Sequence, residues 1–289
     1  MIINNIVKIR RKLYIDGKGL GYYAYKKFAK KILKPNEFYI IDTNIGPMYL
    51  MDGRDSLMNT IFWSGSHYEL GVIKLLEKVV KPEYTVLDIG GHIGYFALLL
   101  SKLVGVNGKV ITFEPQELLN NFIKENLKLN NVENCKVERV LISNQIGDVE
   151  FNESPDFGHS SISHAILEKK EITTTIKQST TLDNYVANNL EDLDFIKLDV
   201  EGAEYLILNE SSKNALTKYK PALLIEMHNK QIEQMGGNVA SLITFLENIG
   251  YIVKEVDEKT GDLSHLENIN KSNWHIFAQS PSNSSSTQI

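Results

Sequence analysis

Short apolar runs alternate with longer amphipathic stretches through the middle of the chain. The runs at 84–89, 109–113 and 135–142 have the length and composition of buried strands, whereas 93–104 and 116–130 carry apolar residues at helical spacing. This order is βαβαβ, and it predicts a parallel sheet with right-handed crossovers.

The alternation stops at Ser143 and resumes after Thr180. The stretch between them holds a strand-like run at 147–151, a polar segment at 153–163 typical of a substrate loop, and a β-favouring run at 173–176. Beyond it the pattern predicts a helix at 182–188, a strand at 195–199, a helix after Gly202, a strand at 222–226, a helix at 240–249 and strands at 251–256 and 274–278. A seven-stranded α/β sheet with helices on both faces accounts for this order if the final strand runs antiparallel beside its neighbour.

Before the first core strand the chain carries a turn between two apolar runs. Turn residues at 42–47 separate the runs at 38–41 and 48–51, which predicts a hairpin, and 68–80 has apolar residues at helical spacing. The Ser- and Asn-rich composition of the C-terminus predicts disorder. The expected organisation is an N-terminal extension with a hairpin at 1–66, one α/β domain at 67–279 and a disordered tail at 280–289.

The turn after the first core strand has the composition of a nucleotide-cofactor site. It reads Asp88-x-Gly90-Gly91-x-x-Gly94, and its glycines let backbone amides approach a ligand at the start of the next helix. A dinucleotide site would need G-x-G-x-x-G, and the acid at the strand end would repel a diphosphate. The carboxylate of Asp88 instead suits a cationic group, such as the amino group of S-adenosylmethionine.

The second core strand also ends in an acid, Glu114, which precedes Pro115. A carboxylate at this position can accept hydrogen bonds from both hydroxyls of a ribose. The alternative is that Asp88 caps the following helix and Glu114 is a solvated acid. The order and spacing of the two motifs favour the cofactor interpretation.

Two later strands finish in charged residues as well. The fourth core strand ends in Asp199-x-Glu201, and the fifth ends in Glu226-x-His228. Because ligands of open α/β sheets bind beyond the carboxyl ends of the strands, we expect these four side chains to converge beside the cofactor.

Three roles are open for this group. Asp199, Glu201 or His228 can remove a proton from an acceptor hydroxyl. Alternatively, Asp199, Glu226 and His228 can hold a divalent cation that lowers the pKa of that hydroxyl. In a structural role, Lys197 pairs with an acid and Glu201 caps the next helix. We favour metal-free catalysis by Asp199 and His228, with Glu201 and Glu226 positioning them or the substrate.

The composition is that of an ordinary globular chain, with 289 residues of which 43% are hydrophobic. Its single cysteine, Cys135, excludes an intramolecular disulfide and a multi-thiolate zinc site, and its apolar surroundings indicate a buried thiol. No apolar stretch approaches the roughly 20 residues that a membrane span requires, and the N-terminus lacks the apolar core of a signal peptide. The expected location is therefore the cytoplasm.

Charge is concentrated at the N-terminus. Residues 1–34 carry ten basic residues against Asp16, a net of +9, which leaves −14 for the remainder of a chain whose total is −5. This arm can contact anionic lipid headgroups or a phosphorylated carrier at the membrane surface, or it can pack on the domain as an amphipathic helix. Nucleic acid is the weaker interpretation, because the acidic remainder would repel a polyanion.

Several motifs together resemble the FkbM family of S-adenosylmethionine-dependent methyltransferases. They are VLDIGGHIGYFA at 86–97, FEP at 113–115, DFIKLDVEGAE at 194–204 and PALLIEMH at 221–228. The resemblance implies a class I methyltransferase fold of seven strands that acts mostly on hydroxyls of sugars, polyketides and related metabolites. It also implies that the two βα turns contact the cofactor, through Asp88, Gly90, Gly91, His92, Gly94 and Glu114. His92 stands where the family commonly has Asn, and both residues tolerate a left-handed backbone.

The expected function is therefore O-methylation of a hydroxyl on a sugar, glycan or secondary metabolite, with S-adenosylmethionine as the cofactor. A nicotinamide oxidoreductase is the rival class of enzyme, and the spacing of the glycines disfavours it. A non-catalytic protein that keeps the fold is the third alternative. The charged strand ends argue against it, because a binding protein without catalysis does not need them.

Overall fold

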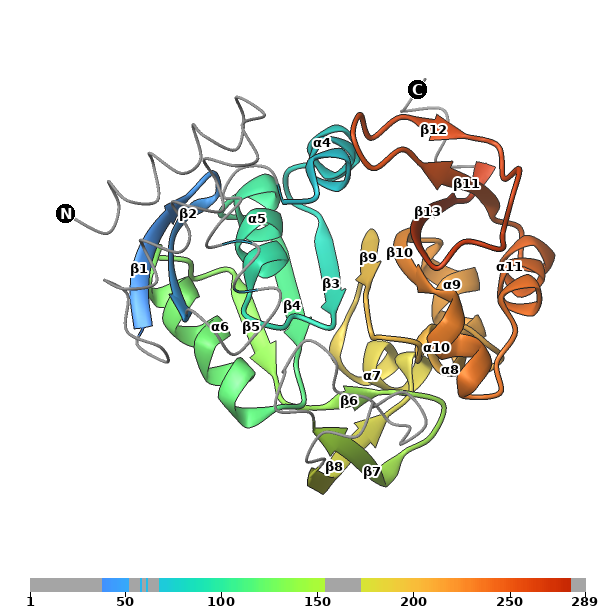
Figure 1. Ribbon diagram of the computed structural model, residues 1–289, viewed down its shortest axis with the longest axis horizontal. Helices are drawn as coiled ribbons and strands as arrows, with labels where there is room; N and C mark the ends of the chain where they lie inside the picture. The colour runs from blue at the N-terminus through green and yellow to red at the C-terminus, as the bar shows by residue number, and fades with distance from the viewer. Residues whose placement is uncertain (1–37, 52–57, 59–60, 62–67, 154–172, 282–289) are drawn as a thin grey trace, which may run out of the picture.

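The computed structural model describes residues 38–51, 58, 61, 68–153 and 173–281 (Figure 1). Its centre is an eight-stranded sheet with the order β12-β11-β13-β10-β9-β3-β4-β5. The strands are β3 (Thr85–Ile89), β4 (Lys109–Phe113), β5 (Cys135–Glu138), β9 (Phe195–Leu198), β10 (Ala222–His228), β11 (Ile252–Val256), β12 (Leu263–Ser264) and β13 (Asn273–Gln279).

The order and directions of the strands confirm the expected sheet. The strands from β5 through β4, β3 and β9 to β10 are parallel, and β13 lies antiparallel between β10 and β11. The two-residue strand β12 adds an eighth member at the edge, beyond the seven expected strands. The carboxyl ends of β3, β4, β9 and β10 therefore meet at one edge of the sheet, where α/β folds bind ligands.

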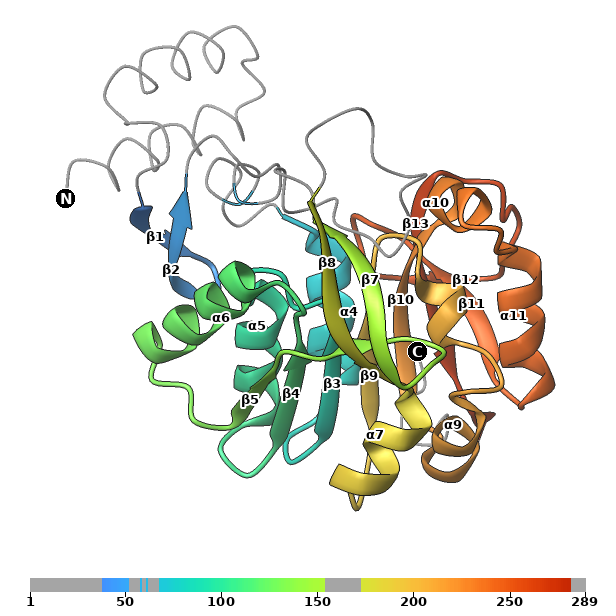
Figure 2. The same ribbon diagram turned by 90° about the horizontal axis from the view of Figure 1, so that it is seen from below.

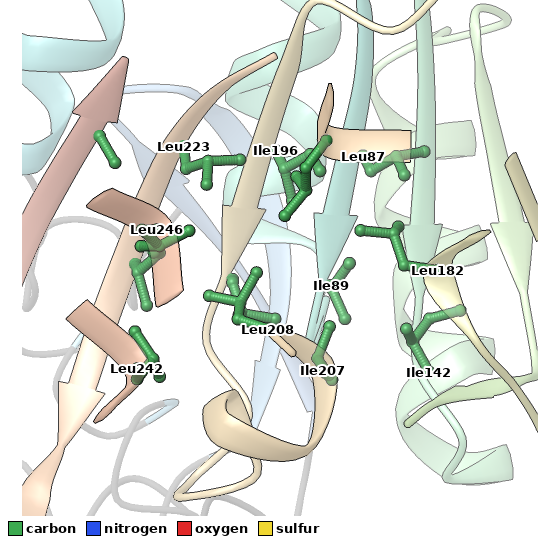
Figure 3. Packing of buried hydrophobic residues seen from close by; sticks show 14 of the residues in the cluster. Leu87, Ile89, Ile142, Leu182, Ile196, Ile207, Leu208, Leu223, Leu242 and Leu246 are labelled. Carbon is green, nitrogen blue, oxygen red and sulfur yellow. The ribbon is translucent and has the colours of Figure 1, made fainter. Parts of the chain in front are cut away.

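Helices cover both faces of this sheet, because its strands are apolar on both sides. The helices on one face are α4 (Leu70–Val79), α5 (Tyr95–Val104) and α6 (Glu117–Leu129). The helices on the other face are α7 (Leu182–Asn189), α8 (Glu204–Ile207), α9 (Lys213–Tyr219), α10 (Asn229–Gln234) and α11 (Val239–Asn248). Figure 3 shows the second core, which includes Leu223 of the sheet together with Leu242 and Leu246 of α11.

The expected single strand at 135–142 is wrong, because the chain leaves the main sheet after Glu138. Strand β6 (Leu141–Ile142) instead pairs with β8 (Thr173–Thr180), which also pairs with β7 (Gly147–Glu153). Figure 1 places this small sheet below the ends of β3 and β5, and Figure 2 shows β7 and β8 in front of the main sheet. The irregular stretch therefore builds a second sheet near the ligand-binding edge.

The N-terminal hairpin is confirmed, since β1 (Phe38–Thr43) pairs antiparallel with β2 (Gly46–Met51). The basic arm at 1–34 lies outside the described residues, as do residues 282–289 of the expected tail. At the start of that tail, Ser280 is buried. Among the described helices, none has the length and apolar character that a membrane crossing requires.

Candidate active site

The glycine turn after β3 is closely packed and has no room for side chains at Gly90 and Gly91. At Gly90, where φ is +93°, a Cβ would lie 1.8 Å from the carbonyl oxygen of Asp199, and at Gly91 it would lie 2.1 Å from Thr112 Oγ1. His92 follows with φ at 50°, which confirms the left-handed backbone expected there. The turn therefore packs directly against the end of β9, and only glycine allows that approach.

Asp88 is completely buried beneath this turn. Its Oδ2 accepts a hydrogen bond of 2.9 Å from the Thr112 hydroxyl, whereas its buried Oδ1 has no hydrogen-bond partner. Burial raises the pKa of Asp88, and the ammonium group of Lys197 opposes that shift. Helix α5 has Gly94 at its N-cap and no side-chain cap, so the alternative role of Asp88 as the cap is wrong. An orphaned buried oxygen suits a donor that a ligand supplies.

Glu114 connects the two βα turns. Its Oε2 accepts a hydrogen bond of 3.0 Å from the His92 amide, and its Oε1 accepts one of 2.9 Å from the Gln116 amide. The side chain is buried, so the alternative that it is a solvated strand-end acid is wrong. Burial raises the pKa of Glu114 to about 7, although the two amides oppose the shift. Each carboxylate oxygen keeps acceptor capacity for a ribose hydroxyl.

Protonation of Glu114 should therefore weaken cofactor binding. We expect the affinity for S-adenosylhomocysteine to fall below pH 7, by up to about tenfold per pH unit, because a ribose diol needs the ionised carboxylate. In Glu114→Gln, binding should be weak and independent of pH between about 5.5 and 7.5. Calorimetry on both proteins measures this, with the exposed Glu117→Gln as the control. A pH profile like that of the wild type in Glu114→Gln would assign the titration to another group.

Polar residues cross the main sheet on one face near the same edge. In the strand register, Lys197 of β9 lies opposite Asp88 of β3, and Glu226 of β10 lies opposite His275 of β13. Along its own strand, each of these four residues lies two positions from an apolar residue of the core under α4 and α5. Because side chains alternate between the two faces of a sheet, all four point to the face that α4 and α5 cover. Strand register thus places residues from distant parts of the chain side by side.

His228 is the centre of the group at the strand ends. Its Nδ1 lies 2.8 Å from Oε1 of the fully buried Glu204. Its Nε2 lies 3.4 Å from Glu226 Oε1, 3.7 Å from Glu201 Oε2 and 4.0 Å from Asp199 Oδ1. The structure therefore brings together the four residues that the sequence placed in one cluster.

The carboxylates around His228 control its charge. Burial lowers its pKa, but Glu204 and Glu226 outweigh burial and raise it well above its usual value. Burial raises the pKa of Glu201 to about 8, although His228 opposes the shift. Burial also raises the pKa of Glu226, but the neighbouring imidazoles of His228 and His275 outweigh it and hold the pKa well below its usual value.

Lys197 is buried beside the same cluster. Its ammonium lies 3.2 Å from Asp199 Oδ2 and 4.4 Å from the ring centre of Phe96. This confirms the pairing of Lys197 with an acid and leaves Asp199 Oδ1 toward His228. The alternative role of Glu201 as a helix cap is wrong, because the Gly202 amide donates to Glu204 Oε1 instead, at 3.2 Å.

Three residues of the site were given no role from the sequence: Glu69, Glu204 and His275. Glu204 lies in the quoted block at 194–204, yet nothing local shows that it holds an imidazole 24 residues away. His275 gave a weak signal, a titratable residue inside an apolar strand. Within the part of the chain that the structure describes, two groups have the ligand atoms for a metal ion, namely Asp199, Glu226 and His228, and Glu69, Glu226 and His275. The first is the set that the sequence suggested.

The strand order and the glycine turn define a class I methyltransferase fold that uses S-adenosylmethionine. Residues 88–253, more than half of the chain, match the model of the methyltransferase FkbM domain. The chain belongs to this family. The match supports S-adenosylmethionine as the cofactor and contradicts the alternative of a nicotinamide oxidoreductase.

Individual relatives are distant. The protein-L-isoaspartate O-methyltransferase of Methanopyrus kandleri is 27% identical over 121 residues, which are 42% of this chain and 53% of that one. The chain thus matches about half the length of this curated relative. Precorrin-6y C5,15-methyltransferase of Geobacter metallireducens is 14% identical, with a TM-score of 0.42 over 73% of this chain and 88% of that one. An S-adenosylmethionine-dependent O-methyltransferase of Thermotoga maritima is 15% identical, with a TM-score of 0.42 over 85% of this chain and 78% of that one.

Proposed function

We propose that the protein transfers a methyl group from S-adenosylmethionine to a hydroxyl of a sugar, glycan or secondary metabolite. The observation that carries this proposal is the contact between the glycine turn and the strand-end cluster. The Cα of Gly90 lies so near the carbonyl oxygen of Asp199 that a Cβ would approach it to 1.8 Å. A methyl donor held by the turn would therefore lie beside the group that can remove a proton.

The residues of the first turn fit the donor. Gly90 and Gly91 let the turn pack tightly against Asp199 and Thr112, Asp88 Oδ1 lacks a partner for an ammonium group, and Glu114 can hold the ribose. Bound S-adenosylmethionine supplies a methyl group on a sulfonium, and the electrons of the breaking C–S bond stay on sulfur.

The acceptor hydroxyl must lose its proton as its oxygen bonds to the methyl carbon. Asp199 Oδ1 lies 4.0 Å from His228 Nε2, and Asp199 takes the proton, because the raised pKa of His228 keeps the imidazole protonated at neutral pH. Glu204 fixes the ring of His228 through Nδ1, as an orienting carboxylate does in other acid–base pairs. Glu201 and Glu226 hold the acceptor or the ring in place.

The charge of the site favours a neutral acceptor. Four carboxylates surround His228, from Asp199, Glu201, Glu204 and Glu226. Lys197 and the protonated His228 offset part of this negative charge, so the cluster has no surplus of positive charge for a carboxylate or a phosphate, whereas an uncharged hydroxyl can donate to a carboxylate. The site therefore suits sugar hydroxyls better than the carboxyl groups of proteins or the backbone of RNA.

Labelled methyl transfer tests the proposal directly. We expect label from S-adenosylmethionine in neutral glycans, lipid-linked saccharides or hydroxylated metabolites, and the product should resist mild alkali because it is an ether. Label that alkali releases would indicate a carboxyl ester, and label in RNA or amines would likewise contradict the proposal. Binding of S-adenosylhomocysteine without transfer to any acceptor would support a non-catalytic protein.

The basic arm at 1–34 gives a further expectation, based on its charge. Its net charge of +9 should bind anionic membranes or lipid-linked carriers, with a strength that falls as salt increases. Deleting residues 1–34 should abolish cosedimentation with phosphatidylglycerol vesicles at low salt and leave the affinity for S-adenosylhomocysteine unchanged. Equal vesicle binding by both proteins would reject this role.

A further inference from the structure

A cavity of about 450 Å³ lies beside the strand-end cluster. Glu226 lines it, and so do Glu69, at the N-cap of α4, and His275, in β13. The remaining lining residues are Leu70, Val72, Glu258, Lys259 and Asn273. The side chain of Glu226 thus belongs both to this cavity and to the site around His228.

His275 is buried at this cavity without a hydrogen bond. Its exposed fraction is 6%, yet neither ring nitrogen has a hydrogen-bond partner among the described residues. The buried Oε2 of Glu69 also has none. Buried polar atoms of this kind are rare in folded proteins, and a bound ion is one explanation for them.

The distances in this group fit a shared cation better than direct hydrogen bonds. His275 Nε2 lies 3.6 Å from Glu226 Oε2 and 3.8 Å from Glu69 Oε2. Both separations exceed those of normal hydrogen bonds. Ligand atoms that each lie about 2.0–2.2 Å from one metal ion are roughly 3–4 Å apart, which matches these separations.

We infer that Glu69, Glu226 and His275 bind a divalent cation. A set of one imidazole and two carboxylates favours a transition ion such as Mn²⁺ or Zn²⁺ over Mg²⁺ or Ca²⁺, which prefer oxygen ligands alone. The cation would hold Glu226 Oε2, while Oε1 of the same carboxylate faces His228 at 3.4 Å. It would thereby position Glu226 beside His228, and its binding does not depend on which acceptor is methylated.

Titration with Mn²⁺ on the full chain, followed by the electron paramagnetic resonance of the free ion, tests the inference. We expect one Mn²⁺ to bind per chain. The spectrum of the bound ion should show a hyperfine coupling to the nitrogen of an imidazole ligand. His275→Ala should lose the nitrogen coupling and weaken binding by about tenfold or more, as mutation of groups around metal ligands commonly does. Glu69→Gln should weaken binding similarly. The control is His265→Ala, an exposed histidine of the same C-terminal region, which should bind like the wild type.

Other results would overturn the inference. If the wild type shows no saturable Mn²⁺ binding, His275 is a protonated partner of the carboxylates and not a metal ligand. Equal Mn²⁺ binding by the wild type and by His275→Ala would also contradict the inference. Loss of Mn²⁺ in His228→Ala but not in His275→Ala would place the ion with Asp199 instead. Thermal unfolding and S-adenosylhomocysteine binding check that the variants are folded. If His275→Ala does not fold, the Mn²⁺ affinity of Glu69→Gln provides the test. Because the readout is bound Mn²⁺, failure of the proposed methyl transfer would not affect it.

Discussion

Asp199→Asn is expected to lower turnover by roughly 10²-fold or more while the affinity for S-adenosylmethionine stays nearly unchanged. The amide has almost the shape of the carboxylate, but it cannot take a proton from the acceptor. His228→Ala should lose a similar factor, because Asp199 Oδ1 and His228 Nε2 face the same space at 4.0 Å. Neither side chain is among the groups proposed to hold the donor, so cofactor binding should persist.

Single-turnover transfer to a verified acceptor and calorimetry with S-adenosylhomocysteine separate these two effects. Glu210→Gln is the matched control, because this carboxylate is exposed and pairs only with the surface residue Lys213 among the described residues. Wild-type turnover in both Asp199→Asn and His228→Ala would remove the cluster from the mechanism. A parallel loss of cofactor affinity would instead show that these residues support the glycine turn.

The first turn could be predicted from the sequence because its chemistry is local. Asp88 and the three glycines lie within seven consecutive residues, and strand β3 runs directly into them. The left-handed backbone of His92 follows from the same short segment. Spacing along the chain is then nearly equivalent to spacing in the fold.

The convergence of the strand ends could also be predicted, because parallel neighbouring strands end at the same edge of a sheet. The pairing of β9 with β10 was the only structural condition, and the structure has it. By contrast, the contact of Glu204 with His228 depends on a short helix whose rotation the sequence does not specify. The position of His275 opposite Glu226 depends on the register of an antiparallel pair, which core packing sets.

The fate of the segment after Glu138 shows a further limit of local patterns. Leu141 and Ile142 continue an apolar run and look like the end of β5. They belong to another sheet because they pair with Ser179 and Thr180 of β8, more than 30 residues later in the chain. Apolar periodicity therefore identified a strand here but could not identify its partner.

Asp88→Ala should weaken the binding of S-adenosylhomocysteine by about 1.5–3 kcal/mol, which is roughly 10- to 150-fold, because a charge-assisted hydrogen bond is lost. The ligand-free protein should melt at the same temperature or higher. Burial raises the pKa of Asp88, so the ionised group opposes folding at neutral pH, and its Oδ1 has no hydrogen-bond partner to offset that cost. Calorimetry and thermal unfolding of the wild type, Asp88→Ala and Asp88→Asn measure both quantities. A carboxylate kept for stability would show the opposite pattern, with a lower melting temperature and unchanged affinity, and that result would reject the proposed contact with the methionyl amine.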